Sequence, residues 1–409
     1  MVNLIFNNKQ RSILAILSIC AIIVGFFVSR FALSCGIAWL FGQAVINNEF
    51  KKNIKRFLND KVLLAFSGFL LLYFICGLYS YNMDFYWERV RLKLPFLLLP
   101  FGFGSAYYLS KKQLKYLFYL ILACAILSSF WIIGVFILDY NQLSALRNAG
   151  KYIPSPINHV RLSLWLAFSI AIALYFYVKE KQKKIKIALL VAAVYLFIFI
   201  HFFAVRSGIL ALYLVCLLFI IQYIIASKSW TKGIAILLAL VTMPILAYLT
   251  VPSLKDRIEY SKWDLRQLEY NADISNHSDS KRIASLKASI NAIQYNPFFG
   301  SGTGDIKNQI EISYAEILPQ LSKKEKLMPH NQFLYVAVGF GIVGLLIFCY
   351  LLFIIFFKGE QRKNTLLLAA ALILLSSFMW EATIESQLGV TIFCLFSLLP
   401  YSYQKAAKA

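Results

Sequence analysis

Long apolar stretches alternate with short polar connections along almost the whole chain. A helix that crosses a bilayer needs about 20 consecutive, mostly apolar residues. Stretches that meet or approach this length recur twelve times, at residues 12–29, 31–46, 62–80, 92–110, 114–138, 160–178, 186–204, 208–226, 233–251, 331–357, 365–380 and 386–402. The pattern therefore predicts an all-α integral membrane protein with about twelve transmembrane helices.

One polar segment, residues 252–329, is too long for a simple connection and has helical periodicity. One helix is expected after the capping residues at 276–280 and before Asn296–Pro297, with an apolar face made of Ile283, Leu286, Ile290 and Ile293. A further amphipathic stretch carries Ile306, Ile310, Ile317 and Leu321. The chain thus divides into nine membrane helices at 1–251, a partly helical loop at 252–329 and three membrane helices at 330–409.

The basic residues indicate which way the chain crosses the membrane. Lys and Arg are concentrated in alternate connections, as in the clusters at 51–61 and 179–186. Because basic residues favour the cytoplasmic side, both termini are expected in the cytoplasm and the loop at 252–329 outside. The net charge of +22 then reflects mainly the orientation of the chain in the membrane, reinforced by attraction to anionic lipids. It is not a sign of nucleic-acid binding. The predicted cytoplasmic connections contain no glycine-rich phosphate-binding loop, so nothing in them suggests ATP as a substrate.

His330 is the first candidate for chemistry. If Pro329 occupies the first position of a helix, then His330 shares a helical face with Ala337, Gly341 and Gly344. Small residues mark a face against which another helix packs closely, so the imidazole is expected to point into the bundle. An ionisable group in that position suits proton transfer near neutral pH. The alternative is an interfacial histidine that merely bonds to a neighbour.

Two arginines are candidates for binding an anion. Arg206 lies in HFFAVRSGIL, where two predicted membrane helices meet at a tight outer turn. A guanidinium held there can bind phosphate oxygens in a bidentate manner, although contact with lipid headgroups is the alternative. Arg282 lies on the polar side of the helix that leads into NPFFGSGTGD at 296–305. The glycines and the proline of this segment predict a sharp turn that approaches other backbone closely.

These pieces together resemble the O-antigen ligase and polymerase superfamily. The resemblance lies in Arg206 followed by Leu210, in Arg282 before NPFFGSGTGD, and in His330–Asn331 followed by Gly339, Gly341 and Gly344. The resemblance implies a polytopic bacterial inner-membrane glycosyltransferase with a GT-C-like architecture and a periplasmic active site. It is most similar to the ligases that join an O-antigen polysaccharide to lipid A–core during lipopolysaccharide biosynthesis.

The resemblance also implies a chemistry. The donor would be a glycan on undecaprenyl diphosphate and the acceptor would be lipid A–core. Arg206 and Arg282 match the arginines that hold the donor diphosphate, and His330 matches the histidine that acts as general base. Transfer would proceed with inversion, without a metal ion, another cofactor or ATP.

Further polar residues form a second tier of binding candidates. Arg89, Arg91 and Lys93 lie at an outer membrane edge, where a lipid diphosphate or a lipid headgroup would explain their charge. His159 and Arg161 begin another predicted membrane helix, and Asn331 adjoins the candidate base.

Other functions share much of this pattern. A polymerase that joins lipid-linked repeat units and a protein O-oligosaccharyltransferase would use the same donor groups with different acceptors. A transporter or flippase would instead require polar residues deep in the membrane, and the predicted helices contain almost none.

Overall fold

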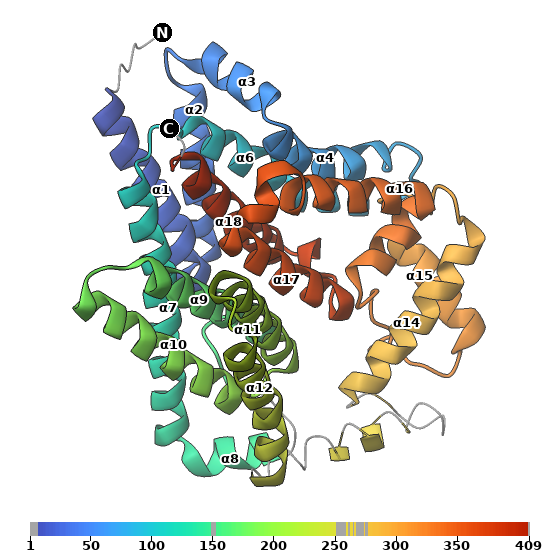
Figure 1. Cartoon of the computed structure of the whole chain (residues 1–409). Coiled ribbons are helices and arrows are strands. Elements are labelled where there is room, and N and C mark those ends of the chain that lie inside the picture. Colours follow the sequence, from blue (N-terminus) through green and yellow to red (C-terminus); the bar gives the residue numbers. More distant parts are fainter. Residues whose placement is uncertain are drawn as a thin grey trace.

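The computed structural model describes residues 7–148, 153–250, 259–260, 262–264, 266, 274 and 277–407, and these contain helices but no strand (Figure 1). Each predicted membrane segment overlaps a helix: α1 (Asn8–Val28), α2 (Arg30–Val45), α4 (Lys61–Ile75), α6 (Pro95–Ser105), α7 (Lys111–Leu138), α9 (His159–Lys179), α10 (Lys183–Phe203), α11 (Arg206–Ser227), α12 (Trp230–Thr250), α16 (Gln332–Phe356), α17 (Thr365–Trp380) and α18 (Gln387–Lys405). Shorter or more polar helices lie between them: α3 (Phe50–Asn59), α5 (Met83–Lys93), α8 (Tyr140–Asn148), α14 (Ser278–Tyr295), α15 (Ile306–Ile317) and the 3-10 helices η1 (Gly359–Lys363) and η2 (Thr383–Glu385).

Six helices in the described part of the chain are long and apolar enough to cross a membrane, namely α1, α7, α9, α10, α11 and α16. A seventh span results if α3 and α4, which meet at a bend of 87°, count as one. Helices α2 and α17 are apolar but shorter, with 16 residues each. The structure therefore confirms an all-helical protein with apolar spans, whereas the number twelve stays a prediction.

Helix α9 forms the centre of the bundle. It contacts α7, α10, α11, α17 and α18, and nearly all of its residues from Val160 to Ala173 are buried. Trp165 donates its indole N–H to the Ile121 carbonyl of α7 at 3.1 Å, and the Phe168 ring stacks on Phe396 of α18 at 4.1 Å. Such aromatic contacts add to close packing. Outside this bundle, α14 and α15 lie side by side at one edge, next to α16 (Figure 1).

Two predicted membrane segments have different ends in the structure. The segment predicted at 62–80 is helical only to Ile75, because the turn after α4 binds the distant segment 303–305. The Thr303 N–H donates to the Cys76 carbonyl at 3.0 Å, and the Gly304 N–H donates to the Ser80 hydroxyl at 2.9 Å. The segment predicted at 92–110 begins at Pro95, since proline fits the first turn of a helix and Lys93 ends α5.

The glycine-rich turn at 296–302 packs into a break in α16. Gly341 leaves the helical conformation, with φ 63° and ψ −167°. Around this break the Ile342 N–H donates to the Pro297 carbonyl at 2.8 Å, and the Gly302 N–H donates to the Gly339 carbonyl at 2.8 Å. The turn therefore supplies backbone partners that the interrupted helix lacks, which buried backbone groups require.

The most deeply buried positions of α14 are not those of its aliphatic face. The buried positions carry small side chains, which are Ala284, Ser285, Ala288, Ser289 and Ala292. Small residues let α14 approach α15 and α16 closely, and the Ser313 hydroxyl of α15 donates to the Ala288 carbonyl at 2.7 Å. On the aliphatic face, Ile283 and Leu286 line a cavity, Ile293 is half-buried against the core and Ile290 is exposed. Helix α14 ends as expected, with Asn296 as its C-cap.

The junction between the turn and α16 predicts an effect of Gly300→Ala. Gly300 has a φ of 71°, and a Cβ there would lie 2.4 Å from the backbone of Gly339. The strained conformation costs roughly 1–3 kcal/mol even before the clash is counted. We expect Gly300→Ala to lower the yield of monodisperse protein and its Tm in detergent. The matched control is Gly134→Ala in α7, where a new Cβ meets nothing within 4 Å; equal losses for both variants would contradict the prediction.

Candidate active site

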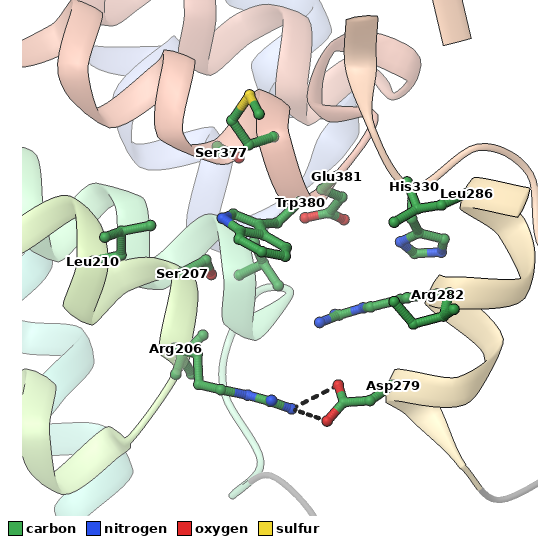
Figure 2. Close-up of a pocket in the computed structure, with 14 residues that line it drawn as sticks. Arg206, Ser207, Leu210, Asp279, Arg282, Leu286, His330, Ser377, Trp380 and Glu381 are labelled. Atoms are coloured by element: carbon green, nitrogen blue, oxygen red, sulfur yellow. Dashed lines mark hydrogen bonds and ion pairs between the residues drawn. The ribbon is translucent and has the colours of Figure 1, made fainter. Parts of the chain in front are cut away.

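A cavity of about 420 Å³ lies between the first turns of α9 and α11, the end of α17 and the exposed side of α14 (Figure 2). Its size is within the range of ligand pockets in proteins. Apolar side chains form most of its wall: Val160, Val205, Leu210, Ile283, Leu286, Met379 and Trp380. The polar groups that face it are Arg206, Ser207, Asp279, Arg282, His330, Ser377 and Glu381.

Arg206 lies at one side of the cavity as the first residue of α11. The connection from α10 is shorter than predicted and consists of Ala204 and Val205, with Ala204 in the left-handed region at φ 52°. Gly208 lets α11 approach α9, because a Cβ at this position would lie 2.3 Å from the Ser163 side chain. The guanidinium points toward α14, and its Nη2 lies 2.8 Å and 2.9 Å from the two carboxylate oxygens of Asp279.

Helix α14 brings Asp279 and Arg282 to the same side of the cavity. Residues three or four apart share a helical face, and Ile283 and Leu286 continue this face along the wall. The start of the helix is held by the fully buried Asp264, whose carboxylate accepts the backbone N–H groups of residues 279 and 280 at 3.0 Å and 3.1 Å. Figure 2 shows the Arg282 side chain extending into the cavity, between Asp279 and His330.

His330 lies opposite Arg206, in the segment before α16. The helix begins at Gln332 with Asn331 as its N-cap, so Pro329 and His330 precede the helix and the predicted helical phasing is wrong. Asn331 accepts from the Leu334 N–H at 3.0 Å and donates to the Met379 carbonyl of α17 at 3.0 Å. The imidazole nevertheless faces the cavity, and its buried Nδ1 has no hydrogen-bond partner among the described residues.

One comparison with known proteins identifies the segment that carries this site. Residues 191–349 match the family model for O-antigen ligases. The segment that carries the candidate site is thus similar to O-antigen ligases. The matched segment runs from α10 to α16, is shorter than half of the chain, and contains Arg206, Arg282 and His330. No curated protein matches the chain.

The match bears on the class of protein. Together with the apolar helices it supports a multi-pass bacterial membrane protein and a link to O-antigen and lipopolysaccharide biosynthesis. The superfamily implies glycosyltransferase-like activity, with a lipid-linked glycan and a lipid acceptor as substrates in general.

The surroundings of His330 in this ligase-family segment favour the neutral imidazole. Burial lowers the pKa of His330 below its usual value of 6.5, because a buried site disfavours the charged form. The positive charges of Arg282 and Arg161 lower the pKa further, whereas the negative charge of Glu381 raises it. At neutral pH the histidine is therefore a proton acceptor, which a general base must be.

Two carboxylates, Glu381 and Asp279, also face the cavity. Glu381 is held at the end of α17 by Arg161, whose Nη1 lies 3.0 Å from the carboxylate and whose Nη2 donates to the Thr383 carbonyl at 3.2 Å. Asp279 pairs with Arg206 across 73 residues of sequence. The only sequence signal for Asp279 is its position one helical turn before Arg282.

Only some of the second-tier candidates lie near the cavity. Arg161 and Asn331 contact residues that line the cavity: Arg161 pairs with Glu381, and Asn331 donates to the Met379 carbonyl. Lys93 lies elsewhere, fully buried in an ion pair with Glu385 at 2.8 Å, and Glu385 also accepts from Tyr73 and Gln332.

The remaining second-tier residues also lie outside the cavity. Arg89 pairs with its neighbour Glu88 and reaches the Glu385 carbonyl, and Arg91 is exposed. His159 lines a separate hollow of about 550 Å³ beside Arg30.

The electrostatics of the site predict how His330 titrates. Diethyl pyrocarbonate modifies neutral imidazole, so the modification rate measured against pH by mass spectrometry gives a midpoint for each histidine. We expect the His330 midpoint below 6.5, because burial and two arginines lower its pKa. Glu381→Gln should move the midpoint to lower pH, since it removes the charge that raises this pKa, and Arg282→Gln should move it to higher pH. The other histidines serve as standards in the same sample, and a midpoint that rises in Glu381→Gln would refute this assignment of charges.

Proposed function

We propose that this protein is an O-antigen ligase, which transfers a polysaccharide from undecaprenyl diphosphate to lipid A–core at the periplasmic face of the inner membrane. The proposal includes the GT-C-like arrangement of about twelve membrane helices, with both termini in the cytoplasm. The single observation that supports it best is one cavity lined by His330, Arg282 and Arg206 within the segment that matches O-antigen ligases.

The proposed reaction is a direct displacement with inversion. His330 takes the proton of an acceptor hydroxyl as that oxygen forms a bond to the anomeric carbon of the glycan. The bond from this carbon to the diphosphate oxygen breaks, and the electron pair leaves with undecaprenyl diphosphate. Arg282 and Arg206 stabilise the charge that develops on the leaving group. The sugar–diphosphate bond already supplies the driving force, so the proposal requires neither ATP nor a metal ion.

The apolar part of the cavity suits lipid substrates. Leu210, Met379 and Trp380 line it and are exposed, on α11 and at the end of α17. A prenyl chain or an acyl chain can contact such side chains while the phosphates meet the arginines. The neighbouring polar and apolar walls therefore support a substrate that is itself amphipathic.

The distribution of glycan in a strain that lacks this protein tests the proposal. We expect long polymer to disappear from lipid A–core and to accumulate on the undecaprenyl carrier, as seen on a gel of surface glycolipid and in the lipid-linked pool. A carrier pool that holds only single repeat units would identify a polymerase instead. If both pools are normal, the acceptor is not lipid A–core, and glycosylated proteins become the alternative to examine.

Variants of the proposed base and of one arginine test the mechanism in the same strain. His330→Ala should abolish polymer transfer, because no other group in the cavity replaces the neutral imidazole. Arg206→Lys should reduce transfer by roughly tenfold or more, because an ammonium cannot bind phosphate oxygens in a bidentate manner. The readout is polymer on lipid A–core, corrected for the amount of protein in the membrane.

Matched variants outside the cavity control for the loss of a histidine or an arginine. His201→Gln changes a histidine at the end of α10 that bonds to Tyr213 at 3.1 Å, and Arg30→Lys changes an exposed arginine at the start of α2. Both should retain transfer. Wild-type transfer by His330→Ala would remove this residue from the mechanism.

A further inference from the structure

The ion pair between Arg206 and Asp279 occupies a place that the proposed reaction needs. Both carboxylate oxygens of Asp279 bond to the same terminal nitrogen of Arg206, at 2.8 Å and 2.9 Å (Figure 2). A phosphate also presents anionic oxygens to a guanidinium, typically to two of its nitrogens. Asp279 therefore occupies one of the nitrogens of Arg206 that the proposed donor diphosphate would bind.

The other charged groups beside the cavity determine which cation a phosphate can bind first. Glu381 is paired with Arg161, and Asp279 is paired with Arg206. The side chain of Arg282 makes no hydrogen bond or ion pair with any residue that the structure describes; only its backbone carbonyl accepts, from the Ser285 hydroxyl at 2.8 Å. One phosphate group can thus bind the Arg282 side chain directly, whereas a second phosphate at Arg206 must compete with Asp279 for Nη2.

Arg206 and Asp279 differ in solvent exposure and in how firmly they are held. The side chain of Arg206 is 48% exposed, while that of Asp279 is 11% exposed. The backbone of Asp279 is held by the buried Asp264 at the start of α14. The arginine is therefore the partner able to move, and its departure leaves the carboxylate without its counter-charge, next to an incoming anion. Both effects oppose binding and favour the return of Arg206 to Asp279.

We propose that Asp279 is an internal competitor for the diphosphate at Arg206, displaced when the donor binds and paired again when undecaprenyl diphosphate leaves. Asp279 thereby sets how tightly the site holds a diphosphate and how readily the product dissociates. It acts through Arg206 and does not touch the reacting atoms. This inference rests on the proposed function, because it takes Arg206 as part of the donor site.

The competition predicts an effect that depends on the number of phosphates. In Asp279→Asn we expect the Kd for undecaprenyl diphosphate to fall roughly two- to fivefold, which is the upper part of the range expected when a partly exposed ion pair no longer has to be broken. The Kd for undecaprenyl monophosphate should change by less than about twofold, because Arg282 alone suffices for one phosphate. In a transfer assay KM for the donor should fall, and kcat should fall as product release slows.

The experiment measures binding of both lipids to the purified chain in nanodiscs, for the wild type and five variants: Asp279→Asn, Asp279→Glu, Glu311→Gln, Arg206→Gln and Arg282→Gln. Asp279→Glu keeps the charge and should retain a diphosphate-to-monophosphate preference near that of the wild type. Glu311→Gln removes the same charge from an exposed position of α15 and should change neither Kd. Tm values show whether each variant is folded, and Asp279→Glu provides the test of charge if Asp279→Asn does not fold.

The outcomes separate this inference from the function on which it rests. If Asp279→Asn weakens diphosphate binding as strongly as Arg206→Gln does, the carboxylate orients Arg206 and does not compete, and the inference is overturned while the donor site stands. A similar gain for both lipids would also overturn it, because the effect would then be general electrostatic attraction. If Arg206→Gln and Arg282→Gln leave diphosphate binding unchanged, the proposed donor site itself fails.

Discussion

The insertion of the glycine-rich turn into the break of α16 is the contact from which the geometry of the site follows. Helix α14 ends where this turn begins, and the first half of α16 ends where the turn binds. Arg282 is carried by the first of these helices, and His330 directly precedes the second. Because backbone hydrogen bonds join the two elements at Gly339 and Ile342, the turn fixes one helix against the other. The distance between the candidate base and a candidate phosphate ligand is thereby set by backbone groups.

A second constraint is electrostatic. The site gathers arginines at the edge of an apolar cavity, where unpaired charges are unfavourable. Carboxylates from distant parts of the chain balance two of them, Glu381 for Arg161 and Asp279 for Arg206. Burial and then the charge of Arg282 lower the pKa of His330, which favours the neutral imidazole that a base requires. These two ion pairs let the cavity form without a ligand. They also leave Arg282 as the first cation that an anionic ligand would meet.

The buried cluster around Glu385 shows how the membrane part supports this site. Glu385 lies in the short helix after Glu381 and accepts from Lys93, Tyr73 and Gln332, which belong to α5, α4 and α16. A lysine buried in this way requires a paired charge, and its partner ties three helices to the segment that bears Glu381. Lys93 therefore has a structural partner within the protein.

The sequence by itself determined the helices, the polar loop with its turn, and the identity of the candidate residues, because these depend on local periodicity and on short motifs. It determined the orientation of side chains less well. The helical phasing of His330 failed because the helix begins after the N-cap Asn331, and not at Pro329. Only the tertiary structure decided which charges meet: Asp279 lies 73 residues from Arg206, and Glu385 lies 292 residues from Lys93. Such pairs are selected by the packing of whole helices in three dimensions, and no local pattern in the sequence records them.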